Sequence, residues 1–96
     1  MFEWDAAKAA ANLAKHGIGF EQASRIFDGP VLTAADIRVD YGELREISIG
    51  VAEGVACLVV VHTDRRGRTR LISARRANRA ERSRYEQAVR TATETD

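Results

Sequence analysis

The sequence has few of the residues that build disulfides or metal centres. Its 96 residues include one cysteine and two histidines, and no spacing among them matches a set of metal ligands. A single cysteine cannot form an internal disulfide. Because Cys57 lies inside an apolar run, we expect it to pack as a small buried side chain. The composition therefore predicts no metal site and no cofactor.

Long apolar runs and a phosphate-binding glycine loop are also missing. No run approaches the roughly 20 residues needed to span a bilayer, and the first five residues are acidic and aromatic, unlike a secretory signal. Gly17 and Gly19 follow an expected helix, whereas a phosphate loop follows a strand. We therefore expect a cytoplasmic protein with no membrane partner. Its length predicts one domain over residues 1–96, with a frayed tail at 91–96.

Arginine, in contrast, is abundant and unevenly placed. Ten of the fifteen basic side chains are arginines between Arg65 and Arg90, whereas residues 1–64 carry five basic and ten acidic side chains. The formal net charge of +1 is thus the sum of an acidic first part and a basic second part. Such a density of guanidinium groups is typical of a surface that binds a phosphate backbone or an acidic partner.

Helix signals mark both ends of the chain. Asp5 can cap an alanine-rich helix over residues 6–15 that ends at Gly17. A second helix, from residue 19 to the Gly29–Pro30 stop, places its apolar side chains on one stripe: Phe20, Ala23, Ile26 and Phe27. Asn78 and Glu81 form a capping box for a last helix, on whose narrow apolar stripe Tyr85 lies.

Strand patterns fill the middle of the sequence, at residues 31–33, 44–51, 55–63 and 69–76. The run at 55–63 lacks alternation, which indicates a central strand covered on both faces. Turns at 53–54 and 64–67 predict an antiparallel meander. Strict alternation places on one face Thr69, Leu71, Ser73 and Arg75, and on the other Arg70, Ile72, Ala74 and Arg76. We predict an α+β fold with two N-terminal helices packed on an antiparallel sheet, followed by a C-terminal helix.

Several polar groups are candidates for a binding or catalytic site. Spacings of four, three and four place Lys8, Asn12, Lys15 and His16 on one side of the first helix. Cations at a helix C-terminus also stabilise the helix dipole, so a purely structural role for Lys15 and His16 remains open. His62 ends the apolar strand and is equally compatible with a structural role.

The residues together resemble the BrnT family of bacterial toxins, over nearly the whole chain. The matching elements are Phe2-Glu3-Trp4-Asp5, Lys8, Asn12, Lys15-His16-Gly17, Phe20-Glu21, Phe27-Asp28, Gly42-Glu43, Arg45, Ile49-Gly50, Val60-Val61-His62-Thr63, Ile72 to Ala77 and Glu81-Arg82. The resemblance implies a RelE-like ribonuclease toxin of a type II toxin–antitoxin pair. It further implies a BrnA-type antitoxin that neutralises the toxin in a heterotetramer and contacts DNA.

The resemblance also implies roles for the candidate residues. Such toxins cleave RNA without metal, by attack of a 2′-hydroxyl on the adjacent phosphate. Arg75 and Arg76, assisted by Lys15, would stabilise the extra negative charge, and His16 or His62 would transfer protons. The residues expected to contact RNA are Lys8, Asn12, Arg70, Arg79 and Tyr85, although core packing is an equal possibility for Tyr85.

One alternative from another functional class stays open at this stage. A non-enzymatic module could use the same arginines to bind nucleic acid or an acidic protein. It would need the charge but no catalytic pair.

Overall fold

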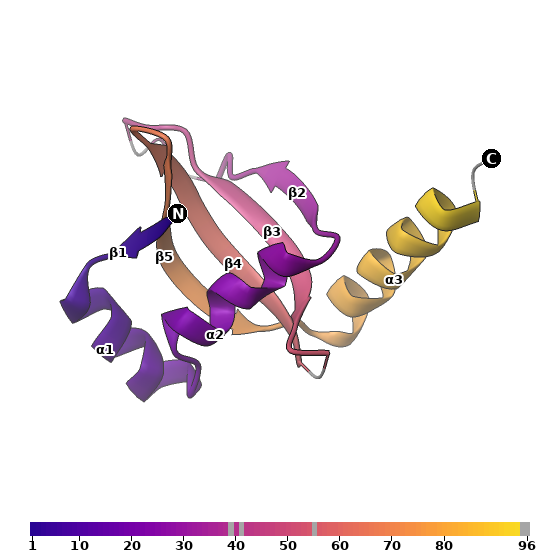
Figure 1. The fold of residues 1–96 in the computed structure, drawn as a ribbon, viewed down its shortest axis with the longest axis horizontal. Helices are drawn as coiled ribbons and strands as arrows, with labels where there is room; N and C mark the ends of the chain where they lie inside the picture. Colours follow the sequence, from indigo (N-terminus) through magenta and orange to yellow (C-terminus); the bar gives the residue numbers. More distant parts are fainter. Residues whose placement is uncertain (39, 41, 55, 95–96) are drawn as a thin grey trace.

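The computed structural model describes residues 1–38, 40, 42–54 and 56–94. The α+β class and the predicted order of helices around an antiparallel sheet are confirmed (Figure 1). The elements are β1 (Phe2–Trp4), α1 (Ala6–His16), α2 (Phe20–Ser24), the 3-10 helix η1 (Arg25–Asp28), β2 (Leu32–Ala35), β3 (Glu46–Ala52), β4 (Ala56–Arg65), β5 (Arg68–Arg76) and α3 (Arg79–Glu94).

Five strands form one sheet in the order β1-β5-β4-β3-β2. The predicted meander of β3, β4 and β5 is confirmed, and the apolar strand β4 lies at its centre. Residue 55, the expected first residue of this strand, lies outside the described part of the chain. The sequence analysis missed β1, which pairs in parallel with β5 from Phe2↔Thr69 to Trp4↔Leu71.

The predicted alternation along β5 is interrupted at Ile72: Ser73 and Arg75 share a face as predicted, but Leu71 does not share it with them. His62 pairs with Leu71 but Val61 pairs with Ser73, so Ile72 is an extra residue on β5. This bulge shifts the alternation by one residue. Leu71 and Ala74 consequently face the same core.

The ends of the helices follow the local sequence signals. The Asp5 side chain accepts a hydrogen bond from the Lys8 N–H, and Gly17 ends α1 with φ of 70°. At α3 the capping box is reciprocal: the Glu81 side chain accepts from the Asn78 N–H, and the Asn78 side chain accepts from the Glu81 N–H, both at 2.8 Å. The predicted caps of both helices are confirmed.

The second and third helices differ from their predicted lengths. The α-helical part of the second helix ends at Ser24, whose hydroxyl donates to the Glu21 carbonyl oxygen, and the chain continues as η1. Such side-chain bonds to the backbone compete with regular helix geometry. α3 continues to Glu94, so residues 91–94 of the expected frayed tail are helical, whereas residues 95 and 96 lie outside the described residues.

The two faces of the sheet are covered differently. α1, α2 and η1 pack on one face and enclose the main core, which includes Ile18, Ile26 and Leu58. β3 approaches η1 so closely at Gly50 that an added Cβ would lie 2.9 Å from the Ile26 Cβ. On the other face, α3 covers only part of the sheet, and its far end projects beyond it (Figure 1). No described helix is long and apolar enough to cross a membrane.

Candidate functional site

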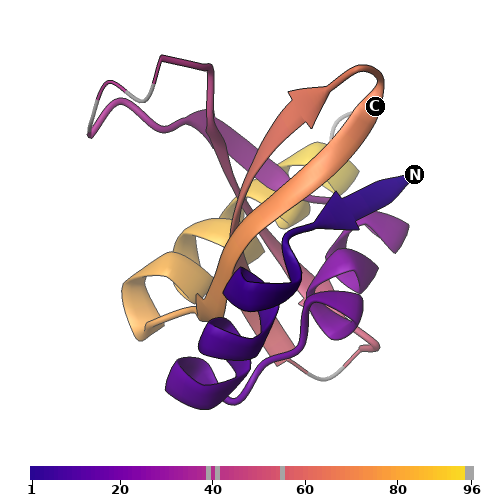
Figure 2. The same ribbon diagram turned by 90° about the vertical axis from the view of Figure 1, so that its left-hand side faces the viewer.

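A shallow hollow of about 300 Å³ lies where α1 meets β5. Lys8, Lys15 and His16 line it from the helix, and Ile72 and Ser73 line it from the strand. Figure 2 shows α1 beside the last part of β5, with the start of α3 on the opposite side of that strand. The polar side of α1 therefore lies beside the strand that carries Arg75 and Arg76. We call this space the edge hollow.

Asn12 fixes the position of α1 against β5. Its Nδ2 donates to the carbonyl oxygens of Ile18, at 3.0 Å, and Ala74, at 2.9 Å, and its Oδ1 accepts from the Ala74 N–H at 3.0 Å. β1 covers the outer edge of β5 only as far as Leu71, so the Asn12 amide satisfies backbone groups beyond the end of β1. Asn12 is buried but also lines the edge hollow, so it has this structural role while its contact with RNA stays a prediction.

The cations of α1 are accessible from solvent. Lys8 and Lys15 are exposed, and His16 is half-buried at the last position of the helix, before Gly17. The structure therefore brings these three predicted residues together with Asn12 beside β5. Lys15 and His16 lie in the last turn of α1, where cations also stabilise the helix dipole, so a structural role and a functional role are compatible for these two.

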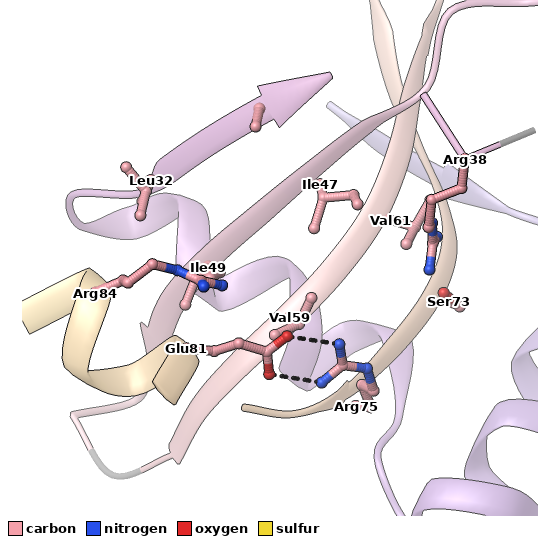
Figure 3. Close-up of a pocket in the computed structure, with 11 residues that line it drawn as sticks. Leu32, Arg38, Ile47, Ile49, Val59, Val61, Ser73, Arg75, Glu81 and Arg84 are labelled. Carbon is pink, nitrogen blue, oxygen red and sulfur yellow. Dashed lines mark hydrogen bonds and ion pairs between the residues drawn. The ribbon is translucent and has the colours of Figure 1, made fainter. Parts of the chain in front are cut away.

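Arg75 lies on the α3 side of β5 and is held by a carboxylate. Its NH1 and NH2 donate to the two carboxylate oxygens of Glu81 at 2.8 and 2.7 Å (Figure 3). The hydrogen bond from Arg75 lowers the pKa of Glu81 to about 2, against the opposing effect of burial. Arg76, the next residue, is exposed. Ser73 lines the edge hollow and also a second space, which Arg75 lines as well.

That second space is a groove of about 500 Å³ on the α3 side of the sheet. Branched aliphatic side chains from β3 and β4, such as Ile47 and Val61, form its floor (Figure 3). Its complete lining is Leu32, Ala34, Arg38, Ile47, Ile49, Val59, Val61, Ser73, Arg75, Glu81 and Arg84. We call it the α3 groove.

His62 lies in the interior on the helix-covered side of the sheet. It is 6% exposed, its Nε2 is 2.7 Å from the Ser48 Oγ, and its ring meets Phe27 edge-on at 5.1 Å. Burial lowers the pKa of His62, while Glu46 acts weakly in the opposite direction. The imidazole is thus almost completely buried among protein groups, and its role in proton transfer stays a prediction.

Two further residues that were predicted to contact RNA form hydrogen bonds within the protein. Tyr85 is buried, and its hydroxyl donates to the Pro30 carbonyl oxygen at 2.8 Å, which favours core packing. Arg70 donates to Glu3 at 3.0 Å. Arg79 is exposed at the first turn of α3. Among the described residues, no three His, Cys, Asp or Glu side chains gather as a metal site would require.

A comparison with family models matches residues 4–81 to the ribonuclease toxin BrnT of type II toxin–antitoxin systems. The chain belongs to the BrnT family. Its function is therefore that of a ribonuclease toxin of a type II toxin–antitoxin system. This assignment decides against the non-enzymatic alternative.

A solved structure supports the same assignment. The crystal structure of the Brucella abortus ribonuclease toxin BrnT matches with a TM-score of 0.62 and 25% sequence identity. The match covers 82% of this chain and 99% of the Brucella chain. Comparison with curated proteins gives no match. The BrnT-like α+β fold is thus shared at low sequence identity.

For this BrnT family member, the sequence analysis missed the α3 groove and two of its basic residues. Arg38 was not selected because it stands outside the arginine-dense segment, and Arg84 because it could equally be a solvated helix residue. The alternation of Ile47 and Ile49 is a usable signal, since it places both side chains on one face of β3. The sequence could not show that α3 leaves part of that face open.

Proposed function

We propose that this BrnT family toxin cleaves RNA without a metal ion, at the edge hollow between α1 and β5. The 2′-oxygen of one nucleotide forms a bond to the adjacent phosphorus, and the bond from phosphorus to the 5′-oxygen breaks. The products are a 2′,3′-cyclic phosphate and a 5′-hydroxyl. The observation that carries the proposal is that Lys15 and His16 line one hollow together with Ile72 and Ser73 of β5.

Proton transfer is assigned to His16. The 2′-hydroxyl must lose a proton and the leaving oxygen must gain one, and histidine is suited to both steps near neutral pH. His16 is half-buried, lines the hollow and lies at the end of a helix that Asn12 fixes against the strand. Since His62 is buried against Phe27, His16 is the histidine that RNA can reach.

Stabilisation of the phosphorane is assigned to Arg75 and Arg76, with Lys15 assisting. Guanidinium groups remain charged and bind two phosphate oxygens at once. Arg76 is exposed, whereas Arg75 is bound to Glu81. Arg75 therefore either contacts RNA through its remaining N–H groups or exchanges the Glu81 carboxylate for phosphate. Lys8 and Arg79, both exposed, extend the basic surface for the rest of the RNA.

The proposed biological setting follows from the family. The toxin acts in the cytoplasm, where cleavage of RNA stops translation and growth. A BrnA-type antitoxin neutralises it within a heterotetramer and contributes the contacts to DNA. The basic surface of the toxin suits a partner that carries acidic groups.

Purified protein and RNA test the reaction directly. In EDTA, we expect cleavage that leaves 2′,3′-cyclic phosphate ends and that stops when the 2′-hydroxyls of the RNA are methylated. Removing a general acid or base lowers the rate by about 10² to 10⁴, so His16→Ala should show a loss of this size. Arg75→Ala should also be slower, whereas Arg66→Ala, an exposed arginine in the distant turn between β4 and β5, is the matched control.

The outcomes separate the parts of the proposal. Undiminished cleavage by both His16→Ala and Arg75→Ala would remove these residues from the site. A wild-type rate that disappears in EDTA would contradict the metal-free reaction.

A further inference from the structure

The α3 groove, whose floor is shown in Figure 3, adjoins a second space beside α3. A second hollow of about 420 Å³ lies between β2 and α3 and is lined by Ser83, Gln87 and Ala88. It shares Leu32 and Arg84 with the groove. The two spaces therefore lie next to each other along α3.

The floor of the groove suits protein better than RNA. Ile47, Ile49, Val59 and Val61 present aliphatic surface, and none of the described lining residues has an aromatic ring. Proteins that hold unpaired bases usually stack them on aromatic side chains. Aliphatic side chains of a partner protein gain free energy when they leave water for such a floor.

The rim of the groove is basic. The lining contains one carboxylate, from Glu81, and three guanidinium groups, from Arg38, Arg75 and Arg84. Arg38 is paired with Asp36 and Arg75 with Glu81. Arg84 is exposed and has no ion-pair partner within the described ranges. The charge at the rim therefore complements an acidic occupant.

We propose that the α3 groove seats an acidic, amphipathic segment of the antitoxin. Apolar side chains of that segment rest on Ile47 and Val61, and its carboxylates pair with Arg84. The proposal rests on the toxin–antitoxin function of the family and does not depend on the location of the RNA site.

The position of the groove gives a route to neutralisation. Ser73 and Arg75 line the groove, and Ser73 also lines the edge hollow on the other side of the same strand. A segment seated in the groove covers Arg75 and restrains the strand beside the hollow. Binding of the antitoxin then removes Arg75 from RNA without entering the edge hollow itself.

The experiment measures affinity between the purified toxin and the protein encoded by the reading frame next to its gene, by calorimetry without RNA. Arg84→Glu reverses the charge of the exposed arginine that has no ion-pair partner among the described residues. Ala34→Glu places a carboxylate on an exposed residue of the lining. We expect each to weaken binding at least tenfold. Arg82→Glu, an exposed arginine of α3 that lines a different hollow, is the control and should stay within about twofold of wild type.

RNA cleavage by the free variants is the second readout. Arg84→Glu and Ala34→Glu should cleave at the wild-type rate and should resist inhibition by the partner. Unchanged affinity in both variants, or no complex with wild-type protein, would overturn the proposal. So would loss of cleavage with affinity retained, which would assign the groove to RNA.

Self-association is the remaining outcome to exclude. Sedimentation of the free toxin should show a monomer; a dimer that Arg84→Glu dissociates would mean that a second copy of this chain occupies the groove. Because affinity is measured without RNA, an inactive toxin would contradict the proposed reaction and leave this test intact.

Discussion

The two faces of the sheet are closed to different degrees. Under α1, α2 and η1, side chains such as Ile18, Leu58 and Val60 are fully buried. Under α3, Ile49 and Val59 are buried against Tyr85, but Ile47 and Leu32 remain half-buried beside the groove. A chain of 96 residues supports one complete core. The difference indicates that the first face holds the fold together and the second is available for a partner.

Truncating one apolar side chain on each face should give the largest contrast. Leu58→Ala leaves a cavity in the closed core, and we expect a loss of about 3 kcal/mol in the free energy of unfolding. Ile47→Ala removes a half-buried side chain at the groove and should cost about 1 kcal/mol. Urea denaturation of both variants measures the two losses in the free energy of unfolding. Equal losses would contradict a difference between the faces.

The second prediction concerns the contact between α1 and the edge of β5. Asn12→Leu keeps the volume of the side chain but leaves the Ala74 N–H and carbonyl oxygen without their partner. Because unsatisfied buried groups cost about 1 to 3 kcal/mol, we expect a loss of about 2 kcal/mol and slower RNA cleavage as α1 shifts. Wild-type stability in this variant would show that packing alone positions the helix.

The smallest effect should come from the ion pair at the start of α3. Glu81→Gln keeps a side chain that can cap the helix but weakens its bond to Arg75, and we expect a loss of about 1 kcal/mol at pH 7. Water screens part of the pair because the Arg75 side chain is 43% exposed.

The pH dependence of that difference gives the control. The pKa of Glu81 is about 2 in the folded protein, below its ordinary value of 4.5. Its contribution is therefore complete above about pH 4.5 and disappears as the pH falls toward 2. Urea unfolding of wild type and Glu81→Gln should converge over this window. A difference that stays constant down to pH 2 would contradict the assignment.

Features encoded in neighbouring residues could be predicted from the sequence. Asp5 with Gly17, and Asn78 with Glu81, mark helix ends through bonds that span only a few residues. The apolar run of β4 also identifies the central strand without reference to other elements. These local signals were sufficient to predict the order of the helices and the meander of β3, β4 and β5.

Features that depend on distant partners could not be predicted. β1 has only three residues and forms because Thr69 to Leu71 are available beside it. The bulge at Ile72 arises between β4 and β5 and reverses which side chains face the core. Asn12 was predicted to lie on a polar side of the first helix that faces a ligand, yet its amide binds the backbone of Ala74.

The candidate site was predicted in part for the same reason. Lys8, Lys15 and His16 were grouped correctly because helix spacing is local, and the structure brings them to β5. His62 and Tyr85 were chosen by residue type, but their burial and their bonds to Ser48 and Pro30 depend on the packed fold. Residue type alone does not distinguish an exposed histidine from a buried one.

The most direct test of the RNA site is a backbone amide NMR titration with an RNA oligonucleotide whose 2′-hydroxyls are methylated, so that it binds but cannot be cleaved. We predict that the largest shifts occur at Lys15, His16, Ile72 and Ser73, on the two elements that form the edge hollow. Shifts confined to the Arg65 to Arg68 turn or to the exposed side of α3, with those four amides unmoved, would contradict it.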